Sequence, residues 1–152
     1  MNTPTLETPQ QIGERIEAAK KAHNTALAEL DARRKQIAEN QAPLLPLLQE
    51  HEQQTAAIAR VEASRGVYLG RVAELQDHVD HTLKKENGDS SRLHDVYALY
   101  PNHVFAERSA AECARWLRAA REKLPALEKE ITALVKERNL KYMLPEHLSH
   151  LA

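Results

Sequence analysis

The sequence contains few cysteine, glycine and aromatic residues. Its 152 residues include one cysteine, four glycines, one phenylalanine, one tryptophan and four tyrosines. Cys113 alone cannot form an intrachain disulfide, which points to a reducing cytoplasm. Four glycines leave few sites for the tight turns of phosphate-binding loops. An interior with so few rings is expected to consist of leucine, isoleucine, valine and alanine, as in helix bundles and coiled coils.

An excess of charge of one sign is also missing. Lys and Arg number 21 against 22 Asp and Glu, a formal net charge of −1. A nucleic-acid partner is therefore disfavoured, because displacing phosphate counterions needs a surplus of cations. No stretch reaches the roughly 18 to 20 apolar residues that cross a bilayer. Residues 1–9 lack the pattern of a signal peptide. We expect a cytoplasmic protein with no membrane partner.

Apolar residues recur every three or four positions over most of the chain, which predicts long amphipathic helices. We expect residues 1–8 to form a flexible tail and residues 9–152 to form a single helical domain. The expected helices span about 9–40, 46–85, 91–100 and 110–139, with a short turn at 145–151.

Local signals set these boundaries. Thr8 and Gln11 fit a capping box at the first helix start. Pro43 and Pro46 cannot both lie inside a regular helix, so the chain is expected to turn there. Pro101 is expected to end the short helix. A second capping box, from Ser109 to Glu112, is expected to open the last long helix, which Pro125 should kink or divide.

These helices predict an all-α, elongated, bundle-like fold. A turn near Pro43 would make the first two helices an antiparallel hairpin or coiled coil. The short crossover helix would then send the third long helix back along the second. The second helix needs that cover, because alanine, histidine and Arg33 interrupt the stripe of the first; a homodimer is the alternative. Gly66 and Gly70 could mark a close helix contact or a bend in the second helix.

One constellation could hold a divalent metal ion. Glu74, His78 and His81 are spaced four and three apart, which places them on one side of the second helix. They lie beside the apolar stripe, and no fourth ligand on another helix is identifiable. We therefore favour a solvated polar face and expect no cofactor, with metal binding as the alternative. Cys113 lies on the stripe of the last helix, so a buried role is favoured over that of a nucleophile near the helix start.

Aromatic residues gather around the predicted crossover. Four of them fall within twenty residues: Tyr97, Tyr100, Phe105 and Trp116. A local core is the favoured interpretation, because buried aromatics are the commoner case. The functional alternative is a partner-binding surface formed by Tyr97, Tyr100 and Phe105. We expect Phe105 or Tyr100 to be more exposed than Trp116.

A leucine cluster at the expected turn is the second candidate surface. It consists of Leu44, Leu45, Leu47 and Leu48. Burial is favoured, because the returning chain offers a set of apolar partners: Leu134, Leu140, Tyr142, Met143 and Leu144. If the last helix points away, Leu44 and Leu45 become partner-binding residues instead.

No motif in the chain specifies a reaction, so we expect a protein that is not an enzyme. A glycine-rich phosphate loop, a G-x-S-x-G elbow and an H-E-x-x-H pair are all lacking. The favoured function is a helical protein–protein interaction module, acting as an adaptor, scaffold or inhibitor for a protein partner. An oligomeric coiled-coil spacer is a further alternative. Abundant alanine, arginine, glutamate and leucine suggest a bacterial or phage source.

Overall fold

The computed structural model describes residues 5–86 and 93–152, and this part of the chain is all-α. It contains three long helices followed by two short 3₁₀ segments, with no strand among the described residues. The elements are α1 (Pro9–Gln41), α2 (Leu44–Glu86), α3 (Leu93–Arg138), η2 (Lys141–Met143) and η3 (Glu146–Leu151). The predicted fold class is confirmed. None of the described helices has the length and apolarity that a membrane span requires.

Backbone packing groups the chain into two compact units, residues 1–43 and residues 44–152. The first unit contains α1, which begins as predicted. The backbone N–H of Gln11 donates to Thr8 Oγ1 at 3.3 Å, and the N–H of Thr8 donates to Gln11 Oε1 at 2.9 Å. This reciprocal capping box satisfies two donors that the first turn of a helix leaves free. The prediction of a single domain over residues 9–152 remains a prediction.

No residue of α1 is buried. The antiparallel pairing of the first helix with the second therefore remains a prediction. Alanine, His23 and Arg33 occupy stripe positions of α1 where leucine would remove more apolar area from water. In the second unit, residues are buried where α3 packs against α2.

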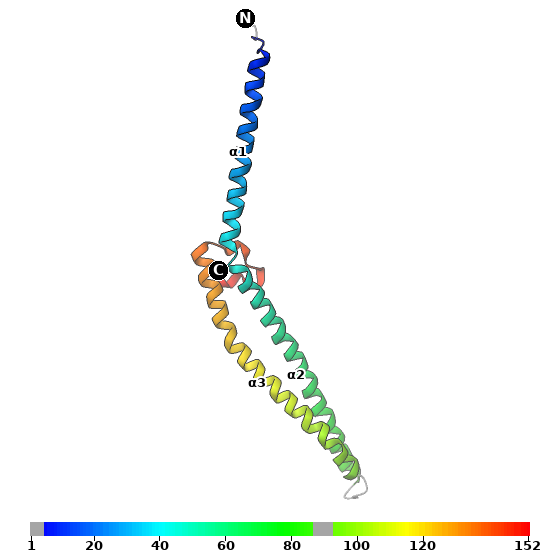
Figure 1. The fold of residues 1–152 in the computed structure, drawn as a ribbon. Coiled ribbons are helices and arrows are strands. Elements are labelled where there is room, and N and C mark those ends of the chain that lie inside the picture. Colours follow the sequence, from blue (N-terminus) through cyan, green and yellow to red (C-terminus); the bar gives the residue numbers. More distant parts are fainter. Residues whose placement is uncertain (1–4, 87–92) are drawn as a thin grey trace. The chain divides into compact units, whose positions relative to one another are not determined.

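In the second unit, α2 and α3 run antiparallel, side by side (Figure 1). The third long helix therefore packs back along α2, as predicted. The predicted helix end at Pro101 and the capping box at Ser109 are wrong, because α3 continues from Leu93 to Arg138 with Pro101 and Pro125 inside it. A proline removes one hydrogen bond of the helix ladder. Packing holds the following turns in place, because Ala106 and Ala110 are buried.

The main hydrophobic core lies where α2 begins and the chain ends (Figure 1). It consists of Leu44, Leu127, Ile131, Val135, Leu140, Leu148 and Leu151. Asn139 turns the chain into this core with a left-handed φ of 55°. The N–H of Leu140 then donates to the carbonyl of Val135 at 3.0 Å. This is the hydrogen bond of a Schellman cap, and it comes with apolar contact between the same two residues.

Gly66 and Gly70 do not mark a close helix contact, contrary to one of the expectations for α2. A methyl group built on either residue meets nothing within 4 Å. Each glycine therefore carries the entropic cost of a helix interior without a packing benefit. We expect Gly66→Ala and Gly70→Ala each to raise the free energy of unfolding by about 0.5–1 kcal/mol. Urea unfolding of the full chain would measure this, and an unchanged or lower midpoint would contradict it.

Candidate functional site

The candidate site is the face of the α2–α3 pair that carries Phe105 and Trp116. Both belong to α3, and Phe105 is 65% exposed while Trp116 is 44% exposed. They are eleven residues apart, which is close to three full helical turns, so they project from the same side of α3 about 17 Å apart. We call this surface the Phe105–Trp116 face. Two aromatic side chains this exposed on one face are a feature of interaction surfaces.

A contact with α2 orients Phe105. Its ring meets the ring of Tyr68 edge to face, with centroids 6.3 Å apart and an interplanar angle of 80°. Val67, next to Tyr68, is exposed. The hollow around these residues has a volume of about 630 Å³, and its polar margin includes Arg71 and Glu74. The ring of Phe105 is thus held by one partner and left open on its other side.

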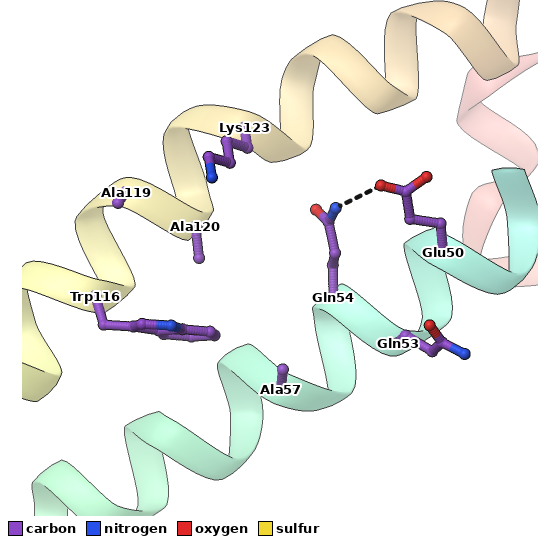
Figure 2. Close-up of a pocket in the computed structure, with 8 residues that line it drawn as sticks. All are labelled: Glu50, Gln53, Gln54, Ala57, Trp116, Ala119, Ala120 and Lys123. Atoms are coloured by element: carbon purple, nitrogen blue, oxygen red, sulfur yellow. Dashed lines mark hydrogen bonds between the residues drawn. The ribbon is translucent and has the colours of Figure 1, made fainter.

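Trp116 lies in a second hollow between α2 and α3, with a volume of about 470 Å³. Figure 2 shows its indole ring extending from α3 toward α2, near Ala57. The apolar lining consists of Trp116, Ala57, Ala119 and Ala120. The three alanines leave this space open, because a longer side chain at any of their positions would fill part of it.

Polar side chains border the second hollow. Glu50, Gln53, Gln54 and Lys123 complete its lining. The amide of Gln54 donates to Glu50 Oε1 at 3.0 Å, which fixes one part of the border (Figure 2). The border thus offers a carboxylate, an ammonium group and two amides around an apolar floor, and this arrangement resembles the rim and centre of a protein interface.

The favoured interpretation of the aromatics as a local core is wrong for the described side chains. Tyr100 is 66% exposed, and with Phe105 it is more exposed than Trp116, as expected. Small side chains, Ala106 and Ala110, fill the buried positions between the helices in this region. The rings of Tyr100, Phe105 and Trp116 lie outside these buried positions and remain exposed.

The structure separates two of the predicted partner-binding residues. Tyr100 and Phe105 are five residues apart, a rotation of about 140° around the helix axis, so they flank the buried seam on opposite sides. Tyr100 lines a different hollow, together with Gln76 and Val79. The side chain of Tyr97 lies outside the described part of the structure. Phe105 is instead aligned with Trp116, which was predicted to lie in the core. The spacing of eleven residues between Phe105 and Trp116 already indicated that they share a face of the helix.

The leucine cluster is divided between core and surface. Leu44 is 0% exposed, so its favoured burial is confirmed and it is removed from the candidate binding surface. Leu47 and Leu48 pack partly against the same core. Leu45 is 54% exposed, and Tyr142, expected as one of its apolar partners, is exposed as well. The predicted burial of the cluster is therefore wrong for Leu45, because consecutive residues of a helix cannot all face the same side.

The metal-binding alternative gains no support from side-chain placement. Glu74, His78 and His81 are all exposed on α2. Glu74 lies 3.5 Å from Arg71 in an ion pair. Among the described residues, no group of three His, Cys, Asp or Glu side chains could hold a metal ion. Cys113 is half-buried, and it lies about twenty residues inside α3, so its predicted position near a helix start is wrong.

One polar pair near the core was missed in the sequence analysis. His51 of α2 is 3% exposed, and its Nε2 lies 3.1 Å from Glu128 Oε1 of α3. Its Nδ1 is buried and has no hydrogen-bond partner in the structure. The pair ties the two helices together beside the core. The signal for it was the position of His51, which is seven residues, or two turns, after Leu44 and so shares its face.

The Phe105–Trp116 face therefore offers apolar anchoring points with polar margins. No protein-family model matches the chain, and no curated protein or solved structure matches it.

Proposed function

We propose that the protein is a non-catalytic helical interaction module that binds an amphipathic helix of a protein partner on the Phe105–Trp116 face. The observation that supports this proposal is the alignment of two exposed aromatic residues, each beside its own hollow, on one side of the α2–α3 pair. In this role the protein is an adaptor, scaffold or inhibitor. From the composition we place it in the cytoplasm of a bacterial or phage-infected cell.

The spacing of the two aromatics suggests a helical partner. A helix laid along the face repeats its apolar side chains at i, i+4, i+7 and i+11, so two of them are separated by the same three turns as Phe105 and Trp116. One apolar side chain of the partner would enter the hollow beside Trp116, and another would pack on the open side of the Phe105 ring. Aromatic residues with adjoining pockets are the usual energetic centres of such interfaces.

The charges on the margins indicate the polar face of the partner. Glu50 and Lys123 border one hollow, and Arg71 and Glu74 border the other. Each margin thus carries both signs, which suits a partner helix with mixed charges on either side of its apolar stripe. Exposed ion pairs of this kind set orientation and contribute little affinity.

The test compares two substitutions with almost the same loss of exposed aromatic surface. Phe105→Ala removes a residue of the proposed face, and Tyr100→Ala removes one of similar exposure on the opposite side of α3. We expect Phe105→Ala to weaken partner binding by at least about tenfold, because truncating a residue at the energetic centre of an interface costs about 2 kcal/mol or more. Tyr100→Ala should leave binding unchanged. The assay is a pull-down from lysate of the source cell, followed by titration of the purified partner.

Trp116→Ala should weaken binding of the same partner, and circular dichroism must show that each variant keeps its helix content. Capture of a protein by the wild-type chain is not sufficient by itself. Loss of that protein on Tyr100→Ala but not on Phe105→Ala would assign binding to the other side of the pair. Equal binding by all variants would refute the proposed face.

A further inference from the structure

Helix α1 carries an apolar stripe that no described residue of its own unit covers. Its positions alternate spacings of four and three residues over more than three heptads: Ile12, Ile16, Ala19, His23, Ala26, Leu30, Arg33 and Ile37. All of them are exposed, and the large apolar ones are 40–54% exposed. A 33-residue helix is about 50 Å long. Helices in proteins gain most of their stability from packing such a stripe against something else.

We propose that α1 pairs with α1 of a second copy of the chain in an antiparallel two-stranded coiled coil. Alternation of four and three is the repeat that keeps a seam facing one partner helix along its whole length. A second copy is the occupant whose fit can be tested from the sequence alone. This inference is independent of the proposed function, because it involves none of the residues of the Phe105–Trp116 face.

A parallel pair would bring like charges together. Each seam residue would then face its own copy, so Arg33 would meet Arg33 of the other helix inside the seam. The flanking Arg15 would lie against Lys20 of the second copy, because in parallel coils each flanking residue faces the one five positions further on. Both contacts are repulsive, and a buried arginine pair without an acidic partner is costly.

An antiparallel pair has a register that removes both repulsions. In this register two facing seam residues have numbers that add to 49. The four kinds of facing pair are Ile12 with Ile37, Ile16 with Arg33, Ala19 with Leu30, and His23 with Ala26. Two of the four pairs, Ala19 with Leu30 and Ala26 with His23, place a small residue opposite a larger one, which is how interdigitated layers fill space.

The charged residues also fit this register. Arg33 would lie opposite Ile16, so its apolar stem can pack while its guanidinium reaches water. On the flanks, Arg15 would face Gln36 and Lys20 would face Leu27. No like charges meet at these positions. The antiparallel orientation therefore avoids both like-charge contacts of the parallel one. The single opposite-charge contact of the parallel pair, Glu29 with Arg34, lies on the exposed flank and contributes too little to offset Arg33 against Arg33 in the seam.

Cross-linking between introduced cysteines tests the register in the full chain. The background is Cys113→Ser, which removes the only native thiol. One preparation carries Ala19→Cys and another carries Leu30→Cys, and the two are mixed, left to exchange and treated with a short bismaleimide. We expect the mixture to give a cross-linked dimer and each preparation alone to give little. Residue 19 would lie about 16 Å, or eleven residues, from its own copy, which is too far for a short linker.

A matched pair of substitutions tests the seam itself. Ala19→Glu places a charge in the seam, whereas Ala28→Glu makes the same change on the outer side of α1. Light scattering of the purified wild-type chain should give the mass of a dimer. We expect Ala19→Glu to raise the dissociation constant by at least about tenfold, because a buried carboxylate without a partner is strongly unfavourable. Ala28→Glu should change it less than about twofold, and circular dichroism should show helix retained in both.

Three results would overturn the inference. A monomer at micromolar concentrations would leave the stripe to another occupant, either a different protein or a segment of the same chain. Preferential cross-linking of residue 19 to residue 19 would show a parallel pair. A dimer with equal sensitivity to Ala19→Glu and Ala28→Glu would place the interface elsewhere. The proposed binding of a partner helix would survive each of these results, because it is measured with substitutions in α3.

Discussion

Replacing Leu44 with alanine is expected to lower the free energy of unfolding of the second unit by about 2–5 kcal/mol. Leu44 is fully buried at the start of α2 and belongs to the core formed with α3 and the end of the chain. The substitution removes apolar contacts and leaves a cavity that surrounding helices can only partly close. Trp116, the only tryptophan, lies in the same unit and reports its unfolding in urea by fluorescence.

The adjacent residue provides the control. Leu45→Ala makes the same chemical change one position along the same helix, where the side chain is 54% exposed. We expect a loss of less than about 1 kcal/mol there, because most of the leucine already faces water. Equal losses at the two positions would show that the core does not form at this end of the α2–α3 pair.

Replacing Glu128 with alanine is expected to lower the free energy of unfolding by about 1–3 kcal/mol. The carboxylate is the only hydrogen-bond partner described for the ring of His51, whose Nδ1 already has none. Removing it leaves a buried imidazole with both nitrogens unpaired, and the desolvation of these groups is then uncompensated. Urea unfolding followed by Trp116 fluorescence measures the loss.

A double-mutant cycle isolates this effect. In a His51→Leu background, the same Glu128→Ala change should cost less than about 0.5 kcal/mol, because no polar ring remains to be stranded. Glu130→Ala, an exposed position on the same helix, should have little effect in either background. A cost of Glu128→Ala that is the same with and without His51 would mean that the pair contributes no coupling energy.

Much of the fold follows from local sequence patterns. Thr8 and Gln11 form their capping box because both partners are three residues apart and need no tertiary contact. The break near Pro43 follows from backbone sterics in the same way. Pro101 was misjudged because its effect depends on distant packing: residues after it are held against α2 by Ala106 and its neighbours. A rule of local propensity cannot include that contribution.

The candidate site was harder to predict than the fold. Clustering of aromatic residues in sequence indicated the region of α3 but not the side on which each ring lies. Phe105 and Tyr100 are close in sequence and are separated by the helix rotation, whereas Phe105 and Trp116 are more distant and share a face. Exposure of Trp116 depends on the alanines Ala57 and Ala120 across the hollow, and a single-helix pattern does not reveal them.

The position of the core at one end of the α2–α3 pair has a consequence for motion. Opening the pair near Ile131 would break many apolar contacts at once, so its free energy approaches that of complete unfolding. Farther along, the described part of the seam buries two leucines and two alanines: Leu75, Leu117, Ala106 and Ala110. Local separation of the helices there requires less free energy. The core end of the pair is therefore expected to open less readily than the part that carries Ala106 and Ala110.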